Sequence, residues 1–190
     1  MNPILEAAWE IDRSCTTLGL RFCFIGGLAV LRWGEPRLTR DVDLTIVCAY
    51  GAEASVIDPL LERFAPRIDD ARDFALRHRV LLLQAANQVP MDVALGALPF
   101  EERAAQRASR WRIDEDVLLL TCGPDDLLVY KVFAGRDRDW LDVEGVIERQ
   151  RDRLDRELIR AELRPLLELS GAVDHLVRMD ALFDPRSRPG

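Results

Sequence analysis

The feature that most constrains this chain is a pair of aspartates set into an apolar run. Asp41 and Asp43 stand in the stretch DVDLTIV, where most of the other residues are aliphatic. Side chains two positions apart in a β-strand lie on the same face of the sheet, so the pattern predicts a strand over Asp41–Val47 with both carboxylates on one face. Two carboxylates this close repel each other, and a hard divalent cation, which prefers oxygen ligands, is the usual compensation. The stretch therefore predicts a metal-binding strand.

A glycine pair, Gly26-Gly27, precedes this strand and stands directly before the apolar stretch Leu28–Trp33. That stretch predicts a short helix, which Gly34 ends. Without side chains, the two glycines let backbone N–H groups at the start of the helix approach a phosphate closely. A phosphate-binding turn close in sequence to a metal-binding strand indicates phosphoryl or nucleotidyl transfer.

The order of these features resembles a known family. Gly-Gly, a helix and then Arg-x-Thr-x-Asp-Val-Asp-Leu, all within Phe24–Ile46, look like the nucleotidyltransferase fold of DNA polymerase β type. The pattern is most similar to the AbiEii branch, which contains toxins of bacterial toxin–antitoxin and phage-defence systems. The stretch PMDVALG adds a candidate third carboxylate, Asp92. A downstream lysine, arginine and aspartate motif of the family is matched by Lys131, Arg136, Asp139 and Asp142.

The resemblance covers roughly residues 20–147. It implies a nucleotidyltransferase-type mixed β-sheet flanked by helices, of the α/β (α+β) class, with a helical C-terminal part. We expect a nucleotidyltransferase core domain at residues 1–122 and a helical part at residues 123–190 that packs on the core.

Periodicity and turn residues predict the individual elements. Strands are expected at Arg21–Ile25, Asp41–Val47, Arg79–Gln84 and Met91–Leu95, and around Arg112 and Val117–Leu120. Helices are expected at Pro3–Thr17, Leu28–Trp33, Ala52–Phe64, Pro99–Arg107, Asp125–Ala134 and Arg138–Gln150. The remainder is expected to form two more helical segments, broken near Pro165 and Ser170-Gly171.

The resemblance also implies which residues hold the metal. Asp41, Asp43 and Asp92 would bind Mg²⁺ or Mn²⁺, and Asp92, on a neighbouring strand, would take the proton of the acceptor hydroxyl. The structural alternatives are an ordinary exposed strand edge for the first two residues and a strand-end carboxylate without a metal for Asp92.

A second set would bind the nucleotide: Gly26, Gly27, Arg37, Thr39, Arg136 and Asp139. Lys131, the single lysine of the chain, would touch phosphate as a catalytic residue. Plainer alternatives exist for each group. The glycines can form a simple tight turn, Arg37 and Thr39 can be solvent-facing strand residues, and Lys131 and Arg136 can form a structural ion-pair set with Asp139.

Composition limits the other classes of function. The formal net charge of −7 argues against a general nucleic-acid binder, although arginines cluster at 103–112 and at 149–156. The four cysteines show no Cys-x-x-Cys spacing, so neither a zinc site nor a disulfide framework is expected. No apolar run approaches transmembrane length, and we expect a cytoplasmic protein with no membrane partner.

The preferred hypothesis is a metal-dependent nucleotidyltransferase that moves NMP from an NTP to an acceptor hydroxyl. The AbiEii resemblance implies a toxin, with a cognate antitoxin protein as partner and tRNA or a similar RNA as acceptor. Two alternatives stay open. One keeps the chemistry but uses a small hydroxylated acceptor, as aminoglycoside nucleotidyltransferases do, and the other is a non-catalytic binding partner or antitoxin that acts by occlusion.

Overall fold

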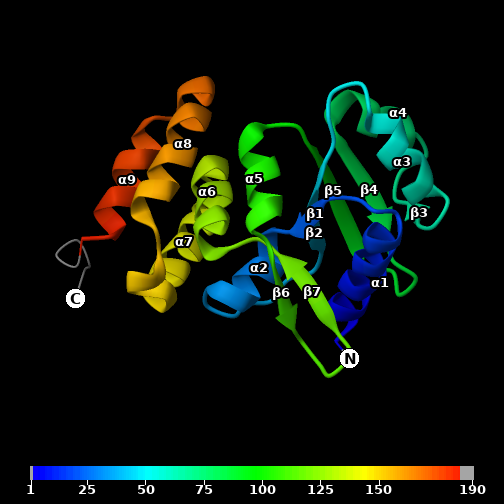
Figure 1. The fold of residues 1–190 in the computed structure, drawn as a ribbon, viewed down its shortest axis with the longest axis horizontal. Helices are drawn as coiled ribbons and strands as arrows, with labels where there is room; N and C mark the ends of the chain where they lie inside the picture. Colours follow the sequence, from blue (N-terminus) through cyan, green and yellow to red (C-terminus); the bar gives the residue numbers. More distant parts are fainter. Residues whose placement is uncertain (1, 185–190) are drawn as a thin grey trace. The chain divides into compact units, whose positions relative to one another are not determined.

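The computed structural model describes residues 2–184, which form two compact units (Figure 1). The first unit comprises the chain up to Leu28 together with Leu38–Cys122, and it contains every strand of the described residues. The second unit comprises Ala29–Arg37 together with the chain from Gly123 onward. The domains expected from the sequence are 1–122 and 123–190, so Ala29–Arg37 was expected in the first of them. The structure groups this segment with the second unit instead.

The first unit is built on a mixed sheet, which has seven strands within residues 2–184 in the order β3-β4-β5-β2-β1-β7-β6 (Figure 1). The strands are β1 (Phe22–Phe24), β2 (Val42–Val47), β3 (Ala65–Pro66), β4 (Val80–Gln84), β5 (Pro90–Gly96), β6 (Ser109–Arg112) and β7 (Leu118–Thr121). β2 is parallel to β5 and antiparallel to β1, while β1 is parallel to β7. The predicted α/β (α+β) class with a mixed sheet is therefore confirmed.

Strand β2 forms the middle of this sheet, and its side chains alternate between the core and the other face. Val42, Leu44 and Ile46 are fully buried, so one face of the strand contributes to the core. Asp43, between two of them, is only partly buried, and so is Asp92 on the neighbouring strand β5. The alternation leaves the polar side chains on the other face.

Four helices complete the described part of the first unit: α1 (Pro3–Thr17), α3 (Glu53–Leu61), α4 (Ala71–His78) and α5 (Pro99–Arg107). α1 begins at the predicted residue, because the Asn2 side chain accepts a hydrogen bond from the Ile4 N–H and Pro3 occupies the first helical turn. The sequence does not predict α4. Only Ala71 and Ala75 of this helix are buried, so it shows no apolar stripe of useful length.

Helix α2 (Gly26–Trp33) carries the chain from the first unit, which includes Leu28, into the second, which begins at Ala29. The helix includes both glycines, whereas the sequence predicts a start at Leu28. Gly26 has a φ of 56°, in the left-handed region that glycine adopts without a steric penalty. The turn before the helix therefore requires glycine at this position.

The second unit is helical throughout its described part and contains the end of α2 together with α6 (Pro124–Ala134), α7 (Asp137–Gln150), the 3₁₀ turn η1 (Arg151–Arg153), α8 (Arg156–Ser170) and α9 (Asp174–Leu182). The predicted break at Pro165 is wrong, since α8 continues through this residue. A buried stripe that includes Ile159 and Leu163 holds the helix together despite the hydrogen bond that proline cannot make. The break near Gly171 is confirmed, because this glycine ends α8 with a φ of 72°.

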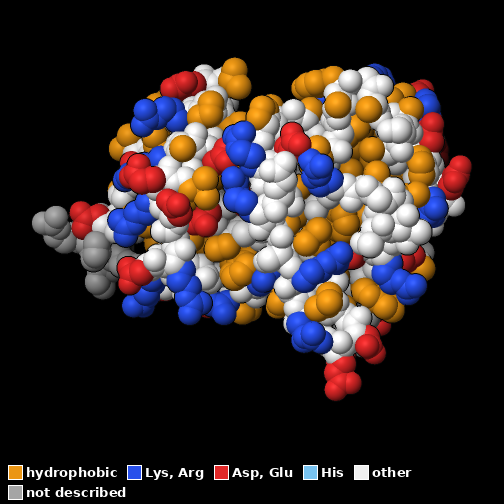
Figure 2. All heavy atoms as spheres, in the orientation of Figure 1, with side chains coloured by type: hydrophobic (Ala, Val, Ile, Leu, Met, Phe, Trp, Pro, Cys, Tyr) orange, Lys and Arg blue, Asp and Glu red, His pale blue; other side chains and the backbone are white. Residues whose placement is uncertain are grey.

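Three further properties concern the helices, the cysteines and the surface charges. None of the helices formed by residues 2–184 combines the length and the apolar composition needed to cross a lipid bilayer. The cysteines are buried free thiols. On the face shown in Figure 2, basic and acidic side chains are interspersed rather than separated into broad regions of one sign.

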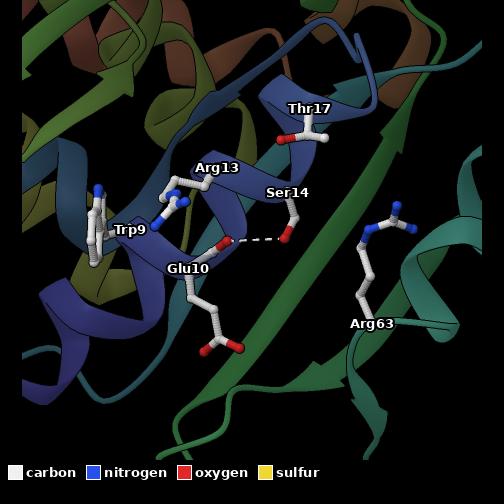
Figure 3. Close-up of a pocket in the computed structure, with 6 residues that line it drawn as sticks. All are labelled: Trp9, Glu10, Arg13, Ser14, Thr17 and Arg63. Atoms are coloured by element: carbon white, nitrogen blue, oxygen red, sulfur yellow. Dashed lines mark hydrogen bonds between the residues drawn. The ribbon is translucent and has the colours of Figure 1, made fainter.

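A surface pocket of about 340 Å³ lies on helix α1 in the first unit (Figure 3). Its lining residues are Trp9, Glu10, Arg13, Ser14, Thr17 and Arg63. The Arg13 guanidinium lies 5.0 Å from the centre of the Trp9 ring, and the Ser14 hydroxyl donates to the Glu10 carbonyl. None of the residues predicted to bind metal or nucleotide lines this pocket.

Candidate active site

Two of the three predicted metal ligands lie side by side in the first unit. Asp43 of β2 is the register partner of Asp92 of β5, and the two strands run parallel. Register partners on neighbouring strands project to the same face of a sheet. The structure therefore brings these two carboxylates onto one face, although they are separated by almost fifty positions in the sequence.

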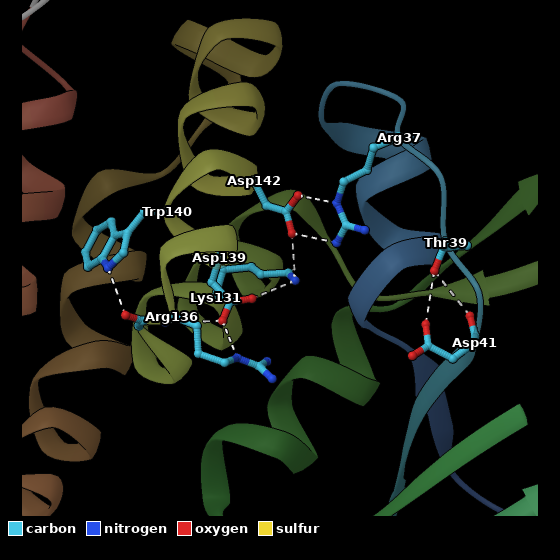
Figure 4. A network of polar contacts seen from close by, with 9 residues as sticks. Arg37, Thr39, Asp41, Lys131, Arg136, Asp139, Trp140 and Asp142 are labelled. Atoms are coloured by element: carbon cyan, nitrogen blue, oxygen red, sulfur yellow. Dashed lines mark hydrogen bonds and ion pairs between the residues drawn. The ribbon is translucent and has the colours of Figure 1, made fainter.

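Asp41, the third predicted ligand, lies directly before β2, which begins at Val42 rather than at the predicted Asp41. Its carboxylate accepts a hydrogen bond of 3.2 Å from the Thr39 hydroxyl (Figure 4). The charge of Asp41 also raises the pKa of Asp92. Asp41 is thus close enough to Asp92 for the two carboxylates to interact electrostatically.

The pKa of Asp92 reflects a balance of three effects. Burial is the largest and raises the pKa, the Arg67 guanidinium lowers it, and the negative charge of Asp41 raises it again. The net result is a raised pKa. Burial therefore outweighs the contact with Arg67 in setting the pKa of Asp92.

Arg67 is a part of this site that the sequence does not predict. It follows the short strand β3 and forms an ion pair with Asp92 through its Nη2 atom. Its backbone N–H donates to the Leu82 carbonyl at 3.0 Å, and Leu82 is the register partner of Asp92. The only signal that could have found Arg67 is the pairing of β3 with β4, and a two-residue strand leaves no periodicity to detect.

The donor set suits a hard divalent cation, because Asp41, Asp43 and Asp92 offer only carboxylate oxygens. Their arrangement is less complete. Within residues 2–184, no group of three or more His, Cys, Asp and Glu side chains is gathered so that it could hold a metal ion. One oxygen of Asp92 is instead in contact with Arg67. The role of the three aspartates as metal ligands stays a prediction.

The two glycines make room for the neighbouring site residues. A Cβ atom on Gly26 would lie 2.0 Å from Oδ2 of Asp43, and a Cβ atom on Gly27 would lie 2.2 Å from the Thr39 hydroxyl. Real Cβ atoms do not approach other atoms this closely. The start of α2 can therefore lie against Asp43 and Thr39 only because both positions are glycine, and contact with a phosphate stays a prediction.

A second cluster of predicted residues lies in the second unit, around Lys131 of α6. The Lys131 ammonium lies 3.0 Å from Asp139 and 2.8 Å from Asp142, both on α7 (Figure 4). All three side chains are buried, with Lys131 5% exposed and Asp139 not exposed at all. The close approach of α6 and α7 thus buries one ammonium between two carboxylates.

Each of these aspartates is also bound by an arginine. Arg37 donates two hydrogen bonds to Asp142, of 2.6 and 2.8 Å, and Arg136 donates to Asp139 from its side chain at 2.7 Å and from its backbone N–H at 3.3 Å. The Arg136 side chain is 71% exposed, whereas that of Arg37 is 26% exposed. Three cations therefore face two anions, and the cluster carries a net positive charge.

The pKa values of the two aspartates record this surplus of cations. Burial, the largest effect, would raise the pKa of Asp139, but hydrogen bonds and charges from Arg136 and Lys131 together outweigh it and lower the pKa. In the same way, Arg37 and Lys131 outweigh the burial of Asp142 and lower its pKa. Both carboxylates are firmly ionised at neutral pH.

Arg37 and Thr39 lie in different surroundings. The sequence predicts that they alternate along one extended segment that leads to Asp41. Residues 36–40 do not form a strand. Arg37 belongs to the second unit, where it binds Asp142, and Thr39 belongs to the first unit, where it donates to Asp41. Their spacing therefore does not place them on one strand face, and their contacts with nucleotide stay predictions.

Comparison with known proteins identifies the fold. The family described as "Nucleotidyl transferase AbiEii toxin, Type IV TA system" matches residues 10–189. No curated protein matches the chain at a significant level. Among solved structures, a nucleotidyltransferase-like antigen from Paracoccidioides brasiliensis is 15% identical with a TM-score of 0.54, and 94% of each chain is covered. The antibiotic-resistance factor ANT(2'')-Ia is 12% identical with a TM-score of 0.54, and the match covers 92% of this chain and 96% of the other. At these identities, the two structures support the fold alone.

Proposed function

Because the chain belongs to the AbiEii nucleotidyl transferase toxin family of type IV toxin–antitoxin systems, we propose that it transfers NMP from an NTP to a hydroxyl group of an RNA acceptor such as tRNA, with Mg²⁺ or Mn²⁺ as cofactor. The observation that carries the proposal is the register of β2 and β5, which sets Asp43 beside Asp92 on one sheet face. Asp41 acts electrostatically on the same carboxylate. This is the donor chemistry that a nucleotidyl-transfer metal site requires.

Asp41, Asp43 and Asp92 are the residues that would hold the metal in this proposal. Bound metal ions would neutralise negative charge that develops on the phosphates during transfer. Asp92 would take the proton of the acceptor hydroxyl, whose oxygen forms a bond to the α-phosphorus while the bond from that phosphorus to pyrophosphate breaks. The raised pKa of Asp92 suits this role, since it brings the carboxylate closer to the pH at which it must accept a proton.

The nucleotide contacts are proposed for Gly26, Gly27, Thr39 and the two arginines. Arg136 is the best placed of these to meet a phosphate, because its side chain is mostly exposed while one nitrogen is fixed by Asp139. Asp139 acts here as the group that orients the guanidinium. Lys131, proposed as catalytic on the family motif, has a defined part in the structure as the shared cation of the two aspartates.

The biological part of the proposal rests on the family. The protein would act in the cytoplasm as the toxin of a toxin–antitoxin pair, and a cognate antitoxin protein would be its partner. Its net charge of −7 implies that an RNA acceptor would be recognised locally and not by a broad basic surface, and on the face shown in Figure 2 basic side chains form no such surface.

The test is transfer from each of the four labelled NTPs in the presence of Mg²⁺, with total tRNA as acceptor. We expect label on RNA with wild-type protein and transfer lower by about 10²–10³ with Asp43→Asn. A parallel reaction with an aminoglycoside in place of RNA tests the small-molecule alternative, which the fold of ANT(2'')-Ia brings into consideration. Absence of transfer with every nucleotide and both acceptors would contradict the enzymatic proposal and favour a binding partner.

A further inference from the structure

We propose that His175 of α9 is a positioning residue for nucleotide binding, because it holds the turn between α6 and α7 in the conformation that places the Arg136 guanidinium. The inference rests on the proposed function, since it takes Arg136 as a phosphate ligand. It adds a residue outside the family motif quoted above and far along the chain from it.

The turn between α6 and α7 consists of two residues, Gly135 and Arg136. Gly135 ends α6 with a φ of 63°, in the left-handed region, and its N–H donates to the Lys131 carbonyl at 2.9 Å. Glycine adopts many other backbone conformations at little cost. The path of the chain into Arg136 is therefore determined by the contacts that other residues make with the turn.

Trp140 and His175 make such contacts with the turn. The Trp140 indole N–H donates to the Gly135 carbonyl at 3.1 Å (Figure 4). The His175 ring lies directly on Gly135, since a Cβ atom at this glycine would be 2.1 Å from Cε1 of the imidazole. The two rings meet edge to face with their centres 5.4 Å apart. Trp140 is only 2% exposed, so the imidazole packs against a side chain that is itself held in the core of the second unit.

His175 also binds the end of α6 through its Nδ1 atom, which lies 2.9 Å from the Val132 carbonyl oxygen. A carbonyl oxygen only accepts hydrogen bonds, so Nδ1 carries the proton in this contact. Val132 lies in the last turn of α6, where carbonyls have no donor within the helix. The next N–H that could serve it, that of Arg136, donates to Asp139 instead. His175 therefore gives this carbonyl a donor at the point where the helix ends.

The turn and the Arg136 guanidinium are coupled through one oxygen atom. Oδ2 of Asp139 accepts from the Arg136 backbone N–H at 3.3 Å and from the Arg136 Nε at 2.7 Å. Both bonds are made with Arg136 in an extended conformation, with a φ of −72° and a ψ of 156°. A change in the turn would move the backbone donor away from Asp139 and displace the exposed guanidinium with it. His175 thus acts on Arg136 through the backbone of the turn.

The experiment is the binding of inorganic tripolyphosphate to the full chain by isothermal titration calorimetry, without metal or acceptor. We expect His175→Ala to bind tripolyphosphate on the order of tenfold more weakly than the wild type, because a charged phosphate contact loses its fixed geometry. His175→Asn keeps an N–H donor near the position of Nδ1 and should stay within about threefold of the wild type. His78→Ala is the matched control, since it removes the other histidine of the chain, whose ring packs on Phe74 in the first unit, and its affinity should not change.

A double variant separates positioning from a general loss of structure. In an Arg136→Ala background, His175→Ala should weaken tripolyphosphate binding no further, because the residue through which it acts is absent. Thermal unfolding of each variant shows whether the compared proteins are folded at the temperature of the titration. In the transfer reaction, His175→Ala should raise the KM for NTP with little change in kcat, as expected when binding is lost equally from the ground state and the transition state.

Wild-type affinity in His175→Ala would overturn the proposal, and so would a weakening of the same size in the Arg136→Ala background. Binding by His175→Asn as weak as that by His175→Ala would overturn the part played by the Nδ1 donor. No binding of tripolyphosphate to the wild type at millimolar concentration would overturn the proposal as well. If tripolyphosphate binding follows the expectation but no NTP is used for transfer, the proposed enzymatic function fails while the positioning of Arg136 by His175 is supported.

Discussion

The two clusters of predicted site residues are in opposite electrostatic states. In the first unit, burial and, to a smaller extent, the negative charge of Asp41 raise the pKa of Asp92, although Arg67 acts against them. In the second unit, Asp139 and Asp142 are more deeply buried, yet their pKa values are lowered because Lys131 and two arginines surround them. The difference shows that burial alone does not determine the direction in which the pKa of a carboxylate is shifted. In the first cluster, burial outweighs the single arginine that contacts Asp92, whereas in the second cluster one lysine and two arginines outweigh burial.

The largest effect on stability is expected from Lys131→Met, which tests whether the second cluster is self-compensated. The substitution leaves two buried carboxylates without their shared cation, which typically costs about 3–5 kcal/mol of unfolding free energy. Chemical denaturation of the variant and the wild type measures this loss. The matched change in the other cluster, Asp92→Asn, should leave stability unchanged or slightly increased. A loss below 1 kcal/mol in Lys131→Met would show that the two arginines suffice.

The next effect concerns catalysis in the first cluster. Asp43→Asn should lower nucleotidyl transfer by about 10²–10³, the usual loss when one group that stabilises the transition state is removed. The metal-free variant should unfold at nearly the wild-type temperature, because Asp43 is only partly buried and asparagine has nearly the same size and shape. Mn²⁺ with NTP should raise the melting temperature of the wild type, and Asp41→Asn with Asp43→Asn should remove most of that rise. Asp58→Asn, in a surface ion pair, serves as the control.

The contribution of each cluster to the free energy of unfolding should depend on pH in a different way. The folded pKa values of Asp139 and Asp142 lie below their unfolded values, so the two residues contribute stability that is present above about pH 4–5 and is lost as pH falls through the folded pKa values. Asp92, with its raised pKa, has the opposite sign. Unfolding free energies measured from pH 6 to pH 3 should fall less steeply in Asp142→Asn than in the wild type. An unchanged slope would mean that the ion pairs of Asp142 persist in the unfolded chain.

The smallest effect on stability is expected for Arg136→Ala. Its ion pair with Asp139 is made by a side chain that is 71% exposed, so its loss should cost about 0–1 kcal/mol. Arg37→Ala should cost more, because Arg37 makes two hydrogen bonds to a buried carboxylate. If Arg136 meets phosphate, transfer should fall in Arg136→Ala although folding is kept. Thermal unfolding and transfer assayed on the same preparation separate the two contributions, and full activity would remove Arg136 from the nucleotide-binding residues.

The sequence predicts those parts of the fold that have a strong local pattern. The strand around Asp43 is found because aliphatic residues alternate with a polar one, and α1 is found because its cap and its apolar stripe agree. The family resemblance and the fold class are confirmed by the match over residues 10–189 and by the mixed sheet. The helix at Ala71–His78 is missed because its buried residues are only two alanines.

The site is less predictable because its contacts join residues that are distant in sequence. The pairing of Asp43 with Asp92 depends on strand register, which the local pattern does not specify. Arg67 has no motif of its own and acquires its contact only from the β3–β4 pairing. For Lys131, the sequence leaves two hypotheses open, which are a contact with phosphate and a structural set of ion pairs. Its burial between two carboxylates is a property of helix packing that no spacing along the chain reveals.

The grouping of Ala29–Arg37 with the C-terminal helices affects the order in which the two units can fold during synthesis. This segment emerges early, but its partners in the second unit come from α7, where Gln150 donates to the Trp33 carbonyl and Asp142 binds Arg37. The first unit can therefore form around its sheet during synthesis before this segment has its packing partners, which are the C-terminal helices. The second unit can be completed only after α7 has been synthesised, and a nascent chain that ends before α7 carries an incomplete second unit and so an incomplete set of phosphate-binding candidates.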